Sequence, residues 1–499
     1  MKYGTLYSLM ERHHPLPFCS RYLEANFASL PWSTYFSSPQ FTNFLNSLTK
    51  GSFPYTYSFL DSSLNLNVHI RTDFIAFSKL LLIFLRNLLI HSVSSFIYFS
   101  KFSPVDISKS DSLVFVSSPS QLKNKKSRIV SSTSSNKSRF YFVHTTSTNK
   151  PSESLNLTYF IDYFLRKEPY FFFSYSYVNI IHVFKSYVKS FFALIHFIRS
   201  CGFTDIFSVP LHIIFQTFLV DLPSLLILQY SLDSFISDYK YPNLFFEVPF
   251  YEFTTSRAFI YFVHSLSPSS KITCVQHSFN SFLAIYRFAF AQVKFSYLLN
   301  PGTDINYLLD GFAYKRIYHD LGLKNCSVFS STRLIPFKPL SYSSDASNVL
   351  VLLDLHQWRP MINFIIKLSN NNPSFKFVFR SHPKKKQVVS HYLSSLKSDH
   401  YLIDTFGSLT DSLQHHSPLV CLVGCTGACV ELALARIPLL FLSEYIFTNP
   451  LSLCSNLSSF LLHSTDFSSF PQSVLFARNT TSIDFLYESA LPHVTDFNL

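Results

Sequence analysis

Glycine is scarce in this sequence: the chain has 499 residues and only 9 glycines. Phosphate-binding patterns that depend on clustered glycines are correspondingly missing. Neither the Gly-x4-Gly-Lys pattern of P-loop proteins nor the Gly-x-Gly-x-x-Gly fingerprint of dinucleotide-binding folds occurs. The sequence therefore excludes both of these nucleotide sites, and serine and asparagine are expected at many of the turns.

The sequence also offers little for a metal site or for disulfides. Its 8 cysteines are scattered, and the first twenty residues lack the apolar core and small-residue cleavage site of an export signal, so no disulfide framework is expected. Cys421, Cys425 and Cys429 are spaced four apart, but glycines interrupt the segment and no histidine pair follows, so buried thiols are expected and no metal. No Asp-x-Asp pair occurs, which argues against a metal-dependent reaction.

Charged residues make up only 14% of the chain, against about 25% in an average soluble protein. They are unbalanced, with 41 basic and 29 acidic residues and a formal net charge of +12. This surplus favours an anionic partner: a phosphorylated substrate, an acidic membrane face or a nucleic acid. A nucleic-acid surface would interleave aromatic with basic residues, whereas the aromatic residues here follow apolar runs, so no nucleic-acid partner is expected.

Two long apolar segments are interrupted by basic residues. Residues 74–100 contain Lys79 and Arg86, and residues 177–199 contain two lysines and an arginine. Because a charge is costly at the centre of a bilayer, both segments are predicted to be amphipathic helices that do not span a membrane. They could lie in an anionic lipid interface or could face the core with solvated lysines. With a basic chain and two such segments, we favour peripheral contact with an anionic membrane surface.

Strand-like and helix-like patterns alternate from residue 112 onwards, which is typical of a parallel, doubly wound α/β sheet. In the first half we expect helices at 155–165, 175–199, 252–266 and 301–312, and strands at 112–118, 140–146, 225–230, 271–278 and 295–300. In the second half we expect helices at 358–371, 385–397, 408–416 and 426–436, and strands at 348–355, 374–383, 418–424 and 437–442.

A segment rich in proline and serine, residues 335–347, separates the two halves. The expected fold is therefore α/β, with two Rossmann-like domains facing a cleft. Residues 111–338 would form the first domain and residues 339–499 the second, and residues 1–110 would form an N-terminal extension with the apolar, basic helix.

Candidate binding residues follow two strands of the second half. Ligands of open α/β sheets lie outside the carboxyl ends of the strands. Arg380 and His382 end one strand, and Pro383 is expected to start the next helix. Their positive charge could stabilise a phosphate, although a structural histidine and a solvated lysine cluster would give the same pattern.

A turn of small residues follows the other strand. Gly424, Thr426 and Gly427 could present backbone N–H groups and a hydroxyl to a phosphate. Glu431 comes about one turn into the next helix, where its carboxylate could bind the hydroxyls of a ribose. Turns of this kind are common in any α/β fold, and the prediction depends on the two strand ends being neighbours.

These two motifs together resemble the C-terminal domain of two-domain (GT-B) glycosyltransferases. "FRSHP" followed by "CTGACVELALARIPLLFL" is most similar to bacterial sialyl-, polysialyl- and Kdo-type capsule transferases and to the glycerophosphotransferases of teichoic acid synthesis. In that group a His-Pro motif and a Ser/Thr-rich motif hold the cytidine nucleotide phosphate. His382 and Pro383 match the first motif, and Thr426, preceded by Cys425, matches the second in part. Residues 431–438 resemble a Glu-x-x-Ala…Pro pattern for nucleotide-sugars in part, with Leu434 at the alanine position.

The first domain carries a second resemblance. The segment that runs from "FFEVPFYEF" to "QHSFNSF" is similar to the Glu…Glu…Gln-His-Gly region of surface-carbohydrate biosynthesis proteins, with Ser278 in place of the glycine. Glu247, Glu252 and His277 are thus candidates for the general base that deprotonates an acceptor hydroxyl. For the two glutamates, capping or pairing with Arg257 is an equally good interpretation.

The resemblance implies a metal-independent glycosyltransferase that acts in envelope polysaccharide biosynthesis. Its partners would be a nucleotide-sugar donor, CMP-linked by analogy, a glycan or glycolipid acceptor and the inner face of the cytoplasmic membrane, with no cofactor beyond the donor. Two alternatives remain open: a CDP-glycerol-type glycerophosphotransferase, and a non-catalytic protein that binds a membrane or a nucleic acid.

Overall fold

The computed structural model describes most of the chain between residues 74 and 493. The residues outside the described part are 1–73, 100–111, 117–138, 145–170, 202–214, 239–244, 250–253, 277–304, 321–324, 329–346, 354–357, 397–400, 425–426, 443–449, 454, 456, 463–466 and 494–499.

The first half of the chain forms a seven-stranded parallel sheet with the order β3-β2-β1-β4-β5-β6-β7. The strands are β1 (Ser112–Val116), β2 (Arg139–Val143), β3 (Phe171–Phe173), β4 (Phe245–Pro249), β5 (Lys271–Val275), β6 (Ile305–Leu309) and β7 (Cys326–Val328). In the central strand β1 the successive residues 113–116 are all apolar and buried, so both faces of this strand are covered. The order reverses between β1 and β4, which is where a doubly wound sheet has its switch point.

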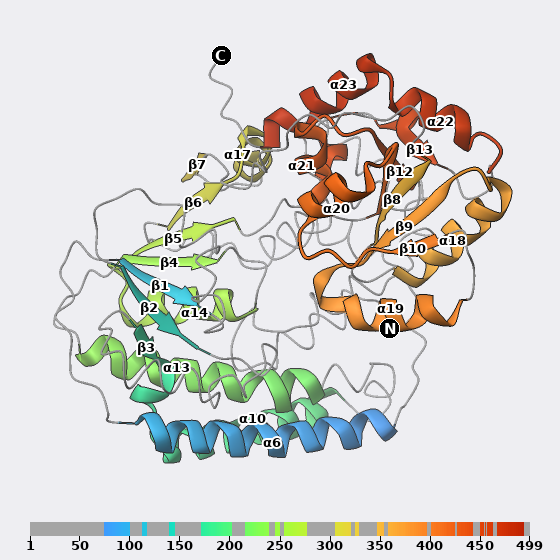
Figure 1. Cartoon of the computed structure of the whole chain (residues 1–499). Coiled ribbons are helices and arrows are strands. Elements are labelled where there is room, and N and C mark those ends of the chain that lie inside the picture. Colours follow the sequence, from blue (N-terminus) through green and yellow to red (C-terminus); the bar gives the residue numbers. More distant parts are fainter. Residues whose placement is uncertain are drawn as a thin grey trace.

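Three helices, α6, α10 and α13, form a layer on one side of this sheet (Figure 1). In that layer α10 packs against both α6 and α13. The helical elements are α6 (Phe74–Tyr98), η2 (Ser174–Tyr177), α10 (Ile180–Cys201), the π-helix η3 (Gln216–Asp221), α13 (Leu222–Asp238), α14 (Thr254–Leu266) and α17 (Phe312–Asp320).

The second half forms a six-stranded parallel sheet with the order β10-β9-β8-β11-β12-β13. Its strands are β8 (Asn348–Leu352), β9 (Lys376–Arg380), β10 (Tyr401–Ile403), β11 (Val420–Val423), β12 (Leu439–Leu442) and β13 (Leu461–Leu462). The helical elements are α18 (Trp358–Asn371), η4 (Pro383–Lys385), α19 (Lys386–Ser395), α20 (Leu409–His416), α21 (Ala428–Leu434), η6 (Pro450–Leu453), η7 (Ser458–Phe460), α22 (Phe470–Ala477), α23 (Thr480–Ala490) and η8 (Leu491–His493). The switch point lies between β8 and β11.

The predicted α/β class with two Rossmann-like parallel sheets is confirmed. The strands of the first sheet lie within residues 112–328 and those of the second within 348–462. The exact domain boundaries fall on residues outside the described part and stay predictions, as does a cleft between the two sheets.

Two predicted elements were wrong. Residues 225–230 belong to α13 instead of a strand, because this helix is enclosed by protein and therefore apolar on nearly every side. Within the predicted helix at 301–312, residues 305–309 form strand β6, which pairs with β5 and alternates buried with more exposed side chains. Pairing with β5 makes this segment a strand. A short apolar run in the sequence does not show which partner it will have.

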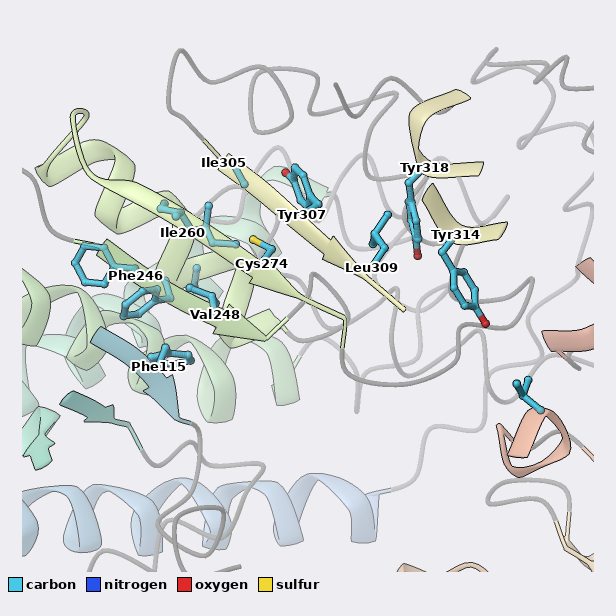
Figure 2. Packing of buried hydrophobic residues seen from close by; sticks show 14 of the residues in the cluster. Phe115, Phe246, Val248, Ile260, Cys274, Ile305, Tyr307, Leu309, Tyr314 and Tyr318 are labelled. Carbon is cyan, nitrogen blue, oxygen red and sulfur yellow. The ribbon is translucent and has the colours of Figure 1, made fainter. Parts of the chain in front are cut away.

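Aromatic side chains extend the apolar core of the first sheet towards the second half of the chain. Figure 2 shows the core running from Phe115 and Phe246 across β5 and β6 to Leu309, with Tyr314 and Tyr318 projecting from α17 beyond it. Both tyrosines are fully buried, and α17 contacts η8 near the C-terminus. The junction of the two halves is therefore built partly by large aromatic residues, of which the sequence has many.

Candidate functional site

The carboxyl ends of four strands in the second sheet are joined by backbone hydrogen bonds. The Leu353 N–H donates to the carbonyl of Arg380 at 3.0 Å, and the Asp404 N–H donates to the carbonyl of Phe379 at 2.9 Å. At the switch point the Gly424 N–H donates to the carbonyl of Leu352 at 3.4 Å. The two predicted motifs, one after β9 and one after β11, therefore lie at the same edge of one sheet, on either side of β8.

Arg380, the last residue of β9, is held in a polar cluster. Its Nη1 donates to Asp404 Oδ2 at 2.5 Å, to Ser412 Oγ at 2.6 Å and to the Phe406 carbonyl at 3.2 Å. Asp404 is fully buried and follows β10, and Ser412 comes from α20. The guanidinium thus ties β9, β10 and α20 together. Its predicted contact with a phosphate stays a prediction.

The charge of Asp404 is maintained by this cluster. Burial alone would raise the pKa of its carboxyl group, but hydrogen bonds from Ser412, Arg380 and the Phe406 N–H, together with the Arg380 charge, hold that pKa below its ordinary value. The Asp404 Oδ1 also lies 3.4 Å from His416 Nε2. Asp404 was not among the residues predicted from the sequence, although its position directly after a short apolar strand indicated a place at the sheet edge.

His382 lies in the turn that follows β9, with its side chain partly buried. The Lys385 N–H donates to the His382 carbonyl at 2.8 Å and closes the short 3-10 helix η4, which starts at Pro383. The α-helix α19 begins only at Lys386, so the expectation that Pro383 starts that helix is corrected.

The second motif is described only in part. Gly424 is buried at the end of β11, and Gly427 precedes the first residue of α21. Glu431 lies in the first turn of that helix and is partly buried. Thr426, with Cys425, lies outside the described residues, so its predicted role is untested.

Of the three candidate bases of the first domain, the structure describes only Glu247. Glu247 is the third residue of β4, not a residue at its end, and only 9% of it is exposed. Its backbone is in register with Val114 of β1 and Thr273 of β5. Glu252 and His277 lie outside the described part. The role of each of the three as a base stays a prediction.

A buried polar cluster, which sequence analysis missed, lies at the carboxyl ends of β2 and β3. His144 follows β2, and its Nδ1 and Nε2 lie 2.9 Å from Ser174 Oγ and 3.2 Å from Ser224 Oγ. His91 of α6 lies with its Nδ1 2.6 Å from the hydroxyl of Tyr175. Polar residues directly after apolar strands, as in "FVHTT" and "FFFSYSY", were the signal in the sequence.

This histidine cluster makes stability sensitive to acid. Burial lowers the pKa of both His91 and His144 from 6.5 to about 3. Below pH 6.5 the unfolded chain therefore binds protons that the folded chain does not bind, and stability is lost as the pH falls towards 3. We expect a loss of up to about 1.4 kcal/mol per pH unit for each histidine.

Urea unfolding between about pH 7 and about pH 5 measures this dependence. The His144→Gln variant should show a smaller pH slope than the parent, and His391→Gln, which changes an exposed histidine, should keep the slope of the parent. Equal slopes in the parent and in His144→Gln would mean that His144 takes up protons in the folded protein.

Among the described residues, no group of three or more histidine, cysteine, aspartate and glutamate side chains could hold a metal ion. Cys421 and Cys429 are buried, and burial raises the pKa of the Cys421 thiol. These two residues therefore have the surroundings of core thiols.

No protein-family model matches the chain, and no curated protein matches it. Solved structures do show a likeness. A putative UDP-N-acetylglucosamine 2-epimerase from Listeria monocytogenes is 10% identical with a TM-score of 0.44, and the match covers 78% of this chain and 93% of that one. MurG from Acinetobacter baumannii is 8% identical with a TM-score of 0.40, covering 77% and 96%.

A UDP-GlcNAc 2-epimerase from Neisseria meningitidis, solved with UDP-GlcNAc bound, is 11% identical with a TM-score of 0.39. The match covers 76% of this chain and 97% of that one. Scores and identities this low assign neither a function nor a subfamily. The fold assignment accordingly rests on the two parallel sheets of this chain.

Proposed function

We propose that the protein is a glycosyltransferase that binds a nucleotide-activated sugar at the carboxyl edge of its second sheet. The observation that carries the proposal is the shared edge: His382 after β9 and the Gly424–Gly427 turn after β11 flank the switch point beside β8. Open parallel sheets bind their ligands outside the carboxyl ends of the strands at this point.

The residue types at this edge suit a nucleotide diphosphate or monophosphate. In the transfer reaction the bond between the sugar and the nucleotide phosphate breaks, and negative charge grows on the departing phosphate. A histidine and backbone N–H groups aimed at that charge would lower the barrier. Glu431, one helical turn from Gly427, would accept hydrogen bonds from the hydroxyls of the ribose.

In this proposal Arg380 mainly positions the site, although its charge alone would suggest that it binds the phosphate. Because its Nη1 already donates to Asp404 and Ser412, its main role would be to position the turn that carries His382. A direct contact with the donor phosphate would use the remaining N–H groups of the guanidinium.

The finer parts of the proposal come from the motif resemblance. They are a cytidine nucleotide in the donor, a glycan or glycolipid acceptor of the cell envelope, charge stabilisation without a metal ion, and a base from among Glu247, Glu252 and His277. The burial of Glu247 within β4 makes it the weakest of the three candidates, because a base must reach the acceptor hydroxyl.

Calorimetric titration of the full-length protein with CMP, CDP, UDP and GDP tests the proposal. We expect a cytidine nucleotide to bind, and we expect Glu431→Gln to weaken binding by about tenfold, the scale for hydrogen bonds from a charged group. Lys376→Ala is the matched control, because Lys376 is an exposed residue at the amino end of β9, the opposite edge of the sheet.

The proposal fails if no nucleotide binds, or if Glu431→Gln binds nucleotide as tightly as the parent. Transfer of glycerophosphate from CDP-glycerol, without sugar transfer from any CMP-linked or other nucleotide-linked sugar, would instead identify a glycerophosphotransferase that uses the same edge.

A further inference from the structure

Helices α6 and α10 form a surface on which large apolar side chains point to solvent. We call this surface the α6–α10 face. From α6 it includes Leu82, Leu85, Leu89 and Phe96, and from α10 it includes Ile181, Phe184, Val188 and Phe192; between 49% and 80% of each of these residues is exposed. The two helices pack against each other and lie side by side (Figure 1), and we therefore treat their exposed apolar side chains together.

Helix α6 is apolar on its exposed side, whereas its buried residues are mostly polar, with Ile90 and Tyr98 as the apolar ones. At 100° per residue, Leu82, Leu85 and Leu89 fall on one side of the helix, while Asn87 and His91 fall on the other. Asn87 and His91 are buried, and so are Ser94 and Ser95 one to two turns further on. A helix that packs on a water-soluble domain has the reverse pattern.

The buried polar side of α6 is anchored inside the first domain. His91 lies within hydrogen-bond distance of Tyr175, and the Ser95 hydroxyl donates to the carbonyl of Val178. In α10, the buried Ser186 and Ser190 donate to backbone carbonyls one turn earlier, both at 2.8 Å. The polar contacts of α6 thus hold that helix on the domain, while the serines of α10 satisfy their hydroxyls within their own helix and α10 is held by packing against α13 and η3.

Positive charge accompanies the apolar residues. Arg86 of α6 and Lys185, Lys189 and Arg199 of α10 are all exposed, and neither helix contains an aspartate or a glutamate. Lys189 also donates to the Tyr230 hydroxyl at 2.7 Å, which holds its charge beside the face. An apolar surface with cations and without acidic residues is complementary to anionic headgroups above a hydrocarbon layer.

Length and composition alone would allow these helices to cross a membrane. Leu81–Tyr98 and Ile180–Arg199 are long and apolar enough to span, and 28% and 33% of these segments are buried in the protein. Thr217–Asp238 is also long and apolar enough, but 72% of it is buried. A spanning helix meets lipid along its whole length, whereas α6 and α10 have one side fixed against the domain. Both helices can lie in the plane of a membrane surface while they keep those contacts.

We propose that the α6–α10 face docks on the surface of an anionic lipid bilayer, with its leucine, isoleucine and phenylalanine side chains in the interface and its cations at the headgroups. This docking goes beyond the proposed function and holds whether or not the protein transfers a sugar. A second copy of the chain, which would bring the same positive charges together, fits the face less well than anionic lipid.

Flotation of the full-length protein with vesicles tests the docking. We expect it to float with vesicles of equal parts phosphatidylcholine and phosphatidylglycerol, to float poorly with phosphatidylcholine alone, and to be released by high salt. The double variant Leu82→Ser, Leu89→Ser should lower the partition coefficient by at least about tenfold, because two leucines lose their lipid contact. The double variant Lys185→Glu, Arg199→Glu should lower it by at least about tenfold on anionic vesicles, since each basic residue contributes about 1 kcal/mol.

Leu475→Ser is the matched control. Leu475 of α22 is 68% exposed, close to the 66% of Leu82, but it belongs to the second half of the chain, and its replacement should leave flotation unchanged. Circular dichroism of each variant checks that the fold is kept. Nucleotide binding, measured separately, distinguishes a failure of the docking from a failure of the proposed function.

Several results would overturn the docking. Absence of the full-length protein from anionic vesicles would mean that another surface, such as a second copy or the chain's own first 73 residues, covers the face. Equal flotation of the parent and both double variants would place the lipid contact elsewhere. Retention on membranes after carbonate extraction would show that one of the helices spans the bilayer.

Discussion

Replacement of His382 by alanine is expected to lower turnover by about 10²–10³-fold, the scale for losing one group that stabilises developing charge. His382 lies in the turn between β9 and η4, at the edge where the donor phosphate is proposed to bind. Its side chain is only partly buried, so the fold should survive the change. Initial rates with the donor that binds in calorimetry, together with the thermal midpoint of each variant, provide the measurement.

Lys385→Ala is the control for His382. Lys385 belongs to the same turn and is also partly exposed, and a charge that solvent screens contributes little to catalysis, so turnover should stay within about threefold of the parent. Full turnover by His382→Ala, or a variant that does not fold, would show that His382 supports the turn and does not act on the phosphate. A larger loss for Lys385→Ala than for His382→Ala would reverse the two roles.

Replacement of Asp404 by asparagine is expected to destabilise the protein by about 3 kcal/mol, the lower end of the range for breaking a buried ion pair. The asparagine would keep the shape of the side chain but would leave the Arg380 guanidinium, only 13% exposed, without its counter-charge. Urea unfolding at neutral pH measures the loss. The matched control is Asp484→Asn, because Asp484 pairs with Arg436 where both side chains are about half exposed, and its loss should cost less than about 1 kcal/mol.

The pH dependence of the Asp404 variant gives an independent check. The pKa of Asp404 in the folded protein is lowered from 3.8, so its contribution to stability is fully present above that value and is lost as the pH falls through the folded pKa. The difference in stability between the parent and Asp404→Asn should therefore shrink in acid, while the effect of the buried histidines cancels in the comparison. A difference that stays constant down to about pH 3 would mean that Asp404 is not ionised in the native state.

The secondary structure of strongly periodic segments was predictable from the local sequence alone. The apolar runs that became β1, β2, β5, β8 and β11 were all predicted as strands, because β-branched and aromatic residues bounded by turn residues have few other stable arrangements. The alternation of strands and helices between residues 348 and 442 also followed from the sequence, whereas β10, β13, α22 and α23 were not predicted. Segments that a partner element decides, such as β6 and the strand-like run inside α13, were not predictable in this way.

The candidate site was likewise predictable in part from local sequence and in part only from the fold. The chain alone indicated that His382 and the Gly424–Gly427 turn follow strands, since each comes directly after an apolar run. That both turns share one edge, on either side of β8, depends on the order of strands in the sheet. The engagement of Arg380 by Asp404 and Ser412 depends on contacts across 24 and 32 residues, which no local pattern encodes.

The sequence by itself determined the α/β class, the two parallel sheets and the presence of two long apolar helices with basic residues, because these follow from periodicity and composition. Only the tertiary structure decided which sides of those helices are exposed. Periodicity shows that a helix has a polar and an apolar side, but the partners of His91 and Ser95 inside the first domain turn the apolar side of α6 outwards. Packing, and not pattern, thus sets the orientation of that surface, because a buried polar group must find its hydrogen bonds wherever the fold provides them.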